Sequence, residues 1–189
     1  MKVWNKRAEM GVGVLIVFIA MLLVAAIAAG VLITTVTSLQ QKALTTGQET
    51  KAEISTHASF VEVSGTDGQD GDLENLSILL RLSAGSDPIS FSDTLMTISL
   101  SDNTGNLRYD ATSTGSTTAY NVTYHVTGTE YREGFMVRGD LVEINFLPPR
   151  DLTSDESVRI TFIPRIGTQS VVEFRTPSVL SRQNMILFP

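Results

Sequence analysis

The feature that most limits the fold of this chain is an uncharged stretch of 32 residues near its N-terminus. No Asp, Glu, Lys or Arg occurs from Met10 to Gln41, and 21 of the 26 residues in Gly11–Val36 are hydrophobic. As an α-helix the stretch would be about 48 Å long, whereas the hydrocarbon core of a bilayer is about 30 Å thick. The stretch is therefore long enough to span a membrane.

The residues on either side of this stretch indicate its orientation and its full length. Lys2, Lys6 and Arg7 precede it, and basic residues before an apolar span keep the N-terminus on the cytoplasmic side. Beyond it, Thr37–Ala58 contains no Pro and only one Gly, so nothing in the sequence ends the helix there. We expect one helix from about residue 10 to about residue 58, roughly 70 Å long.

Two simpler interpretations of the stretch are a cleaved secretory signal peptide and a permanent single-span anchor. Ala26-Ile27-Ala28 has the small residues of a signal-peptide cleavage site, but the apolar run continues past it to Val36. A permanent anchor explains the length of the run but not its many small residues at helical spacing. Small residues let apolar helices approach closely, so we favour a helix that packs among identical helices.

The second part of the chain, from Ser59 to Pro189, has the pattern of an antiparallel β-sandwich. Short runs alternate between apolar and polar residues and are separated by Gly, Asp, Asn and Pro, as in strands joined by turns. The runs are Phe60–Val63, Leu76–Leu82, Leu95–Leu100, Tyr120–Thr127, Phe135–Arg138, Leu141–Phe146, Val158–Ile163 and Val171–Arg175. We expect an α+β chain whose sandwich is immunoglobulin-like, with a hairpin turn at Arg138–Leu141 and a docked apolar tail at Met185–Pro189.

Composition argues against several classes of function. A net charge of −6 and a pI of about 4.9 argue against nucleic acid as a partner, because its phosphates select basic patches. The absence of Cys excludes disulfides, thiolate metal sites and lipid attachment through Cys. Neither His57 nor His125 lies in a nucleophile motif, and no phosphate-binding Gly loop occurs. We therefore expect no enzymatic activity.

Two kinds of site remain to be considered in the second part. The acidic loop with Asp67, Asp70 and Asp72 offers oxygen ligands suited to Ca²⁺, but its spacing does not match a helix–loop–helix calcium loop. We expect an ordinary acidic turn and no cofactor, with a structural Ca²⁺ at these three residues as the alternative. Asn75 and Asn121 each begin an acceptor triplet for N-glycosylation and are candidate glycosylation sites.

The N-terminal part closely resembles that of the archaellins, the archaeal flagellins that form the archaellum filament. The resemblance rests on Gly11–Gly13, Leu15–Met21, Val24–Ile33, Leu39–Ala43 and Thr46–Gln48, with a looser match at Ser83–Ile89. It implies a structural subunit that polymerises through its helix and serves swimming motility. The positions in the filament core would be Leu15, Phe18, Ile19, Met21, Leu22, Ala25, Ala28, Gly30 and Leu32.

The same resemblance implies that a leader is removed from the precursor. Archaellin precursors are cut by a prepilin-peptidase-like enzyme after a basic pair and a small residue. Lys6, Arg7 and Ala8, followed by Glu9, match this pattern, although most family members have Gly where Ala8 stands. The expected organisation is a leader at 1–8, a polymerisation helix at 9–58 and an exterior domain at 59–189. Loss of three positive charges would change the formal charge from −6 to −9.

The resemblance also implies partners and a location. The precursor would be inserted in the membrane, and the mature subunit would join a helical homo- or heteropolymer with other archaellins on the cell surface. A membrane platform with an ATP-driven motor would turn this filament. The alternatives are an archaeal adhesive type IV pilin, which shares the leader and the helix, and a membrane-anchored surface binding module, which would keep its N-terminus.

Overall fold

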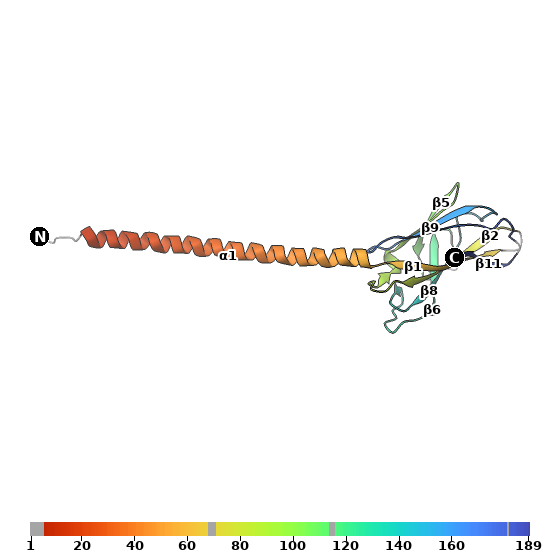
Figure 1. The fold of residues 1–189 in the computed structure, drawn as a ribbon, viewed down its shortest axis with the longest axis horizontal. Helices are drawn as coiled ribbons and strands as arrows, with labels where there is room; N and C mark the ends of the chain where they lie inside the picture. The colour runs from red at the N-terminus through yellow and green to blue at the C-terminus, as the bar shows by residue number, and fades with distance from the viewer. Residues whose placement is uncertain (1–5, 68–70, 114–115, 181) are drawn as a thin grey trace. The chain divides into compact units, whose positions relative to one another are not determined.

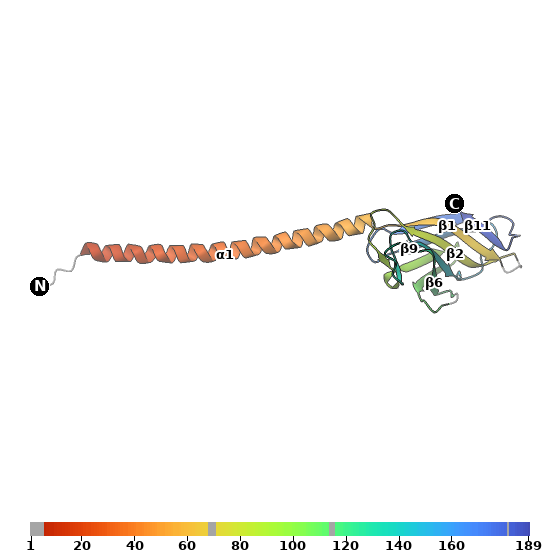
Figure 2. The same cartoon turned by 90° about the horizontal axis from the view of Figure 1, so that it is seen from below.

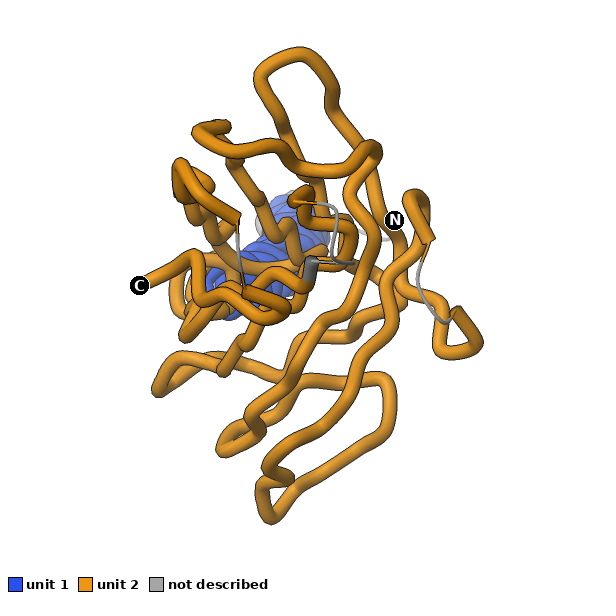
Figure 3. The backbone as a smooth tube through the Cα atoms, turned by 90° about the vertical axis from the view of Figure 1, so that its right-hand side faces the viewer, with its two compact units in different colours: residues 1–49 blue, residues 50–189 orange. Residues whose placement is uncertain are grey.

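A computed structural model of the chain describes residues 6–67, 71–113, 116–180 and 182–189, apart from the side chains of residues 6–8 and 67. Within these ranges the chain forms one long helix, one short 3₁₀ turn and eleven strands (Figure 1). They divide into two compact units, residues 1–49 and residues 50–189, which Figure 3 shows in different colours.

The helix α1 (Lys6–Ser55) contains the whole uncharged stretch. The helix is continuous in both ribbon views (Figure 1 and Figure 2), as expected for a segment without Pro. Its side chains are exposed from Glu9 to Lys51. The last helical bond runs from Thr56 N to Ala52 O (3.0 Å), and the helix therefore ends three residues before Ala58. From there the backbone hydrogen bonds are made with other segments of the second unit.

The eleven strands are all in the second unit and are mostly short. They are β1 (Ala58–Asp67), β2 (Leu73–Leu82), β3 (Ile89–Ser90), β4 (Leu95–Ser99), β5 (Thr104–Tyr109), β6 (Ala119–Val126), β7 (Phe135–Met136), β8 (Leu141–Phe146), β9 (Ser157–Ile163), β10 (Ser170–Arg175) and β11 (Asn184–Phe188). Nine of the described strands form one sheet in the order β10-β9-β4-β5-β6-β8-β2-β1-β11, and β3 pairs separately with β7.

The nine-stranded sheet folds over a single core. Neighbouring strands are antiparallel except β5 and β6, which pair in parallel where Arg108 lies beside Ala119 and Tyr109 beside Tyr120. Buried residues from both halves of the sheet belong to one hydrophobic cluster, and β1 contacts β10, so the sheet is nearly closed. This confirms the predicted α+β class and the largely antiparallel, sandwich-like second part.

Most apolar residues of the alternating runs face the core, and the polar residues between them face solvent. In β2, Ile78 and Leu80 are fully buried, and in β8 so are Val142 and Ile144. The register pairs Ile78 with Ile144 and Leu80 with Val142, so these side chains share one face of the sheet. Burial of each such side chain stabilises the fold by about 1.5–3 kcal/mol, and a slip of one residue would expose all of them.

Two expectations about turns and termini have different outcomes. The predicted hairpin at Arg138–Leu141 is wrong: Gly139 makes a turn at φ 90°, but β7 pairs with β3, and β8 pairs with β2 and β6. The turn therefore passes the chain from the small sheet to the large one. The predicted docking of the apolar tail is confirmed, because β11 pairs with β1.

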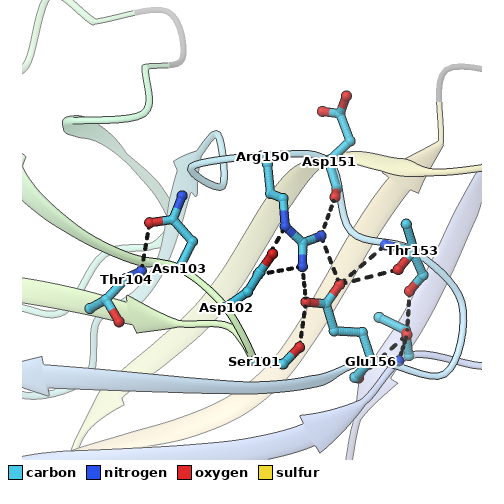
Figure 4. Close-up of polar contacts among 9 residues, drawn as sticks. Ser101, Asp102, Asn103, Thr104, Arg150, Asp151, Thr153 and Glu156 are labelled. Atoms are coloured by element: carbon cyan, nitrogen blue, oxygen red, sulfur yellow. Dashed lines mark hydrogen bonds and ion pairs between the residues drawn. The ribbon is translucent and has the colours of Figure 1, made fainter.

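A cluster of hydrogen bonds and ion pairs connects the loop before β9 with the turn that follows β4 (Figure 4). Arg150 Nη2 lies 2.6 Å from Asp102 Oδ1 and 2.5 Å from Glu156 Oε1, and Ser101 Oγ donates to the same Glu156 oxygen at 3.0 Å. Burial raises the pKa of the Glu156 carboxyl, but hydrogen bonds from Arg150 and Ser101 outweigh burial and leave the pKa below its ordinary value. The hydrogen bond from Arg150 likewise lowers the pKa of Asp102.

We expect Arg150→Met to lower the free energy of unfolding by about 2 kcal/mol near neutral pH, because Glu156 would keep a buried charge with fewer hydrogen bonds. The folded-state pKa of Glu156 is depressed, so its ionised form adds stability above the ordinary value of 4.5. That stability is lost as pH falls through the lower folded value. Urea unfolding of the detergent-solubilised chain at pH 7 and pH 3 measures both effects.

The control for this variant is Arg159→Met, which breaks the exposed pair between Arg159 and Glu173 (3.2 Å). An exposed pair contributes little, so this change should leave both the stability and its pH dependence nearly as in the wild type. Equal stability losses in the two variants would contradict the role assigned to Arg150.

Candidate functional site

The apolar part of α1 has hydrophobic side chains on all sides. Leu15, Ile19 and Leu22 follow one face at helical spacing, and Met21 and Leu32 lie on a different face. Each of the five is between 48% and 70% exposed. A helix that is apolar all round is found in a protein core or in a membrane, so this surface calls for an apolar partner.

The other residues predicted for a filament core lie on the same helix. Phe18 is 57% exposed, and Ala25, Ala28 and Gly30 are exposed as well. A Cβ atom at Gly30 would meet no atom within 4 Å, so space is open around it for an approaching helix. By length and composition α1 is also able to cross a membrane, with a mean hydropathy of 3.1 in an 18-residue window. The role of these residues in a filament stays a prediction.

The apolar surface continues through a group of three threonines near Val36. The hydroxyl groups of Thr34, Thr35 and Thr37 each donate to a helix carbonyl three or four residues earlier, at 2.9 Å. A hydroxyl that is satisfied inside its own helix costs much less in apolar surroundings than a free one. These threonines therefore lengthen the part of α1 that apolar surroundings can accept.

The residues expected at the leader cleavage site lie in the first turns of α1. Lys6, Arg7 and Ala8 are helical, but their side chains lie outside the described part of the chain. Glu9 is exposed in the first turn, where a negative charge is favourable beside the positive end of the helix dipole. Leader processing at these residues stays a prediction.

The end of α1 is hydrogen-bonded to two loops that are distant from it in the sequence. Ser86 Oγ donates to Ser55 O (3.1 Å) and accepts from His57 N (3.0 Å). Thr168 N donates to the carbonyl oxygen of Thr56 (2.9 Å), and Thr56 is buried. A carbonyl group at the helix end, which has no partner within the helix, is thus satisfied by the loop that contains Ser86.

Gly167 makes the second of these contacts sterically feasible. Its φ is +119°, a region that residues with a side chain rarely adopt, and a Cβ atom would lie 2.5 Å from Thr56 O. These contacts at the end of α1, called the junction below, could hardly be predicted from the sequence, since Ser86 and Ser55 are 31 residues apart. The available signals were the looser match around Ser86 and an isolated Gly in an otherwise polar loop.

The two candidate glycosylation sites differ in accessibility. Asn75 is exposed and lies on β2 opposite Thr66. Asn121 is half-buried on β6, and its side-chain oxygen accepts a hydrogen bond from Val122 N (2.7 Å). Attachment of a glycan is therefore sterically easier at Asn75.

The acidic loop considered for Ca²⁺ is described only in part. Asp70 and the side chain of Asp67 lie outside the described residues, and Asp72 is half-buried just before β2. Among the side chains that are described, no three or more His, Asp or Glu residues gather as a metal site would require. The calcium alternative stays untested.

Several known proteins are similar to this chain in sequence. The family model for archaeal-type flagellin matches residues 8–174. Flagellin B2 of Methanocaldococcus jannaschii is 33% identical over 209 residues, covering 96% of this chain and 95% of the relative. Flagellin B2 of Halobacterium salinarum is 31% identical over 189 residues, with the same two coverages.

Two solved structures are similar in fold. A chain of the archaeal flagellum of Methanospirillum hungatei aligns with a TM-score of 0.71 and 15% identity, covering 94% of this chain and 99% of that one. The crystal structure of an archaeal flagellin from M. jannaschii aligns with a TM-score of 0.60 and 17% identity, covering 70% and 96%. At such identities the likeness concerns the fold.

Proposed function

This chain belongs to the archaeal-type flagellin family, and from that premise we propose that α1 is the surface through which it polymerises. The protein is a structural subunit of the archaellum, a filament on the cell surface, and not an enzyme. The observation that supports the proposal is the exposure of apolar side chains all round the helix. Burial of about 1,000 Å² of that surface per subunit would contribute about 25 kcal/mol before the entropy of association is subtracted.

The acidic second unit would form the outside of such a filament. Residues 59–189 contain 9 Arg, no Lys and 17 Asp and Glu, which gives a formal charge of 9 − 17 = −8. A charged, solvated exterior around an apolar helical core fits this distribution. An adhesive type IV pilin and a membrane-anchored binding module share parts of this description, but family membership favours the archaellum subunit.

We further propose that the precursor enters the membrane through α1 and loses its leader between Ala8 and Glu9. The peptidase that cuts it, the membrane platform and the ATP-driven motor would be separate proteins. Cutting there removes Lys2, Lys6 and Arg7 and leaves the apolar helix intact. Loss of these basic residues weakens retention at the cytoplasmic face, which favours transfer of the helix into the filament.

Leader removal makes a prediction that is simple to measure. Sheared filaments should begin at Glu9 by N-terminal sequencing and should show no tryptophan emission, because Trp4 is the only Trp. Arg7→Ala should cause tryptophan-containing precursor to accumulate in the membrane, whereas Lys2→Ala, a change of equal charge away from the cut, should not. Filaments that begin at Met1 or after Ala28 would rule out this site.

We also propose that a glycan is attached to Asn75 in preference to Asn121, since Asn75 is the more exposed. The intact mass of the sheared subunit should exceed the mass of Glu9–Pro189, and Asn75→Gln should remove most of the excess. Asn121→Gln serves as the matched control and should remove little. Loss of the whole excess in the Asn121 variant alone would reverse this order.

A further inference from the structure

A groove of about 550 Å³ lies at one end of the second unit. It is lined by Arg81, Leu82–Ala84, Val126 and Arg138–Leu141. The strand register builds its floor, because Arg81 of β2 lies opposite Leu141 of β8, and Leu141 lies opposite Val126 of β6. On its other side β2 pairs with β1, where Arg81 lies opposite Ser59, so the groove is near the start of β1.

The groove is lined by two exposed arginines, Arg81 and Arg138. Among the described residues, the side chains of Arg81 and Arg138 form no hydrogen bond and no ion pair. Asp140 in the same groove forms no ion pair with either arginine: its two carboxylate oxygens accept from Gly128 N (2.6 Å) and Val137 N (2.9 Å). With two arginines and one aspartate the groove has a formal charge of 2 − 1 = +1 in a part of the chain with a formal charge of −8, and it is therefore suited to an acidic ligand.

The helix carries a matching pair of carboxylates. Glu49 and Glu53 are four residues apart on α1, so they lie on the same face with Cβ atoms about 6 Å apart. Both are exposed, and within the described part of the chain neither has an ion-pair partner. Like charges at this spacing destabilise an isolated helix, and two cations placed against this face would reverse the effect.

We propose that the groove of one subunit binds the Glu49–Glu53 face of the helix of a second copy. Arg is suited to this role because its planar guanidinium binds carboxylates through two parallel hydrogen bonds. The groove and the carboxylate pair are different surfaces of the chain, so the contact is heterologous and, if it does not close, generates a helical polymer. The inference rests on the proposed function, because it requires copies packed side by side.

Charge reversal on each side, followed by exchange, tests the contact. The groove variant is Arg81→Glu with Arg138→Glu, the helix variant is Glu49→Arg with Glu53→Arg, and the exchange variant carries all four changes. We expect the groove and helix variants each to raise the concentration of free subunit left after filaments are pelleted by about tenfold, or about 1.4 kcal/mol. The exchange variant should return it to within about twofold of the wild type.

Salt dependence and a matched control complete the design. Raising ionic strength from about 0.05 M to about 0.5 M should shrink the differences, since it screens the charges. Arg108→Glu with Arg182→Glu changes the net charge equally, and both residues lie outside the groove. Near-UV circular dichroism of the tyrosines checks that each variant is folded.

Each outcome bears on the inference separately from the proposed function. If the groove variant assembles as well as the Arg108 and Arg182 control, the groove is not an assembly contact. If both double variants are weakened but the exchange variant stays weak, the groove takes another acidic ligand and the inference is overturned. Failure of the wild-type chain to polymerise would instead contradict the proposed function.

Discussion

Replacing Leu22 with Asp should abolish filaments while leaving the protein in the membrane. Leu22 lies in the middle of the apolar stretch and is 54% exposed in the isolated chain. In a filament core it would be surrounded by the helices of other subunits, where an unpaired carboxylate costs several kcal/mol in every copy. A single Asp near the centre of a membrane helix costs about 3 kcal/mol, which the neighbouring apolar residues offset.

Electron microscopy of sheared preparations, with immunoblots of the membrane fraction, measures both parts of this expectation. Leu22→Met is the matched control, because it keeps the volume and the apolar character of the site. It should give filaments in normal amount. Normal filaments from the Leu22→Asp chain would show that this face of α1 does not lie in a core.

Gly167→Ala should destabilise the second unit by about 3 kcal/mol. Two penalties combine at this position. Alanine rarely adopts the φ of +119°, and its Cβ would lie 2.5 Å from Thr56 O. Relief of the clash requires the loop to move away, which breaks the hydrogen bond from Thr168 N to Thr56 O.

Gly134→Ala separates the two penalties. Gly134 also has a positive φ, +79°, but a Cβ there would meet no atom within 4 Å. This variant should therefore lose only about 1 kcal/mol, as measured by urea unfolding of the detergent-solubilised chains. Equal losses in the two variants would mean that the contact with Thr56 contributes nothing.

The helix and most strands could be predicted because their signals are local. An uncharged run without Pro predicts α1, and alternation predicts strands such as β8 and β2, in which every second residue is buried along β8 and from Leu76 to Leu82 of β2. The signal fails where a strand buries few residues or is very short. Neither β5 nor β3 is predicted: in β5 only Leu107 is fully buried, and β3 is two residues long.

The candidate site likewise has a part that the sequence predicts and parts that it does not. The apolar surface of α1 is visible in the sequence because it is continuous along the chain. The junction is not visible in the sequence, because Ser86 and Thr168 are far along the chain from Ser55 and Thr56 and contact them only in the folded structure. The groove with Arg81 and Arg138 is likewise a product of strand register, which joins residues far apart in the sequence.

The three threonines near Val36 bear on how the helix could change its surroundings. Thr34, Thr35 and Thr37 form their hydroxyl hydrogen bonds with carbonyl groups of their own helix, so they need neither water nor lipid headgroups as partners. If α1 passes from a bilayer into a bundle of helices, as proposed, no hydrogen bond of these three side chains has to break. These polar residues would therefore add no hydrogen-bond penalty to the transfer.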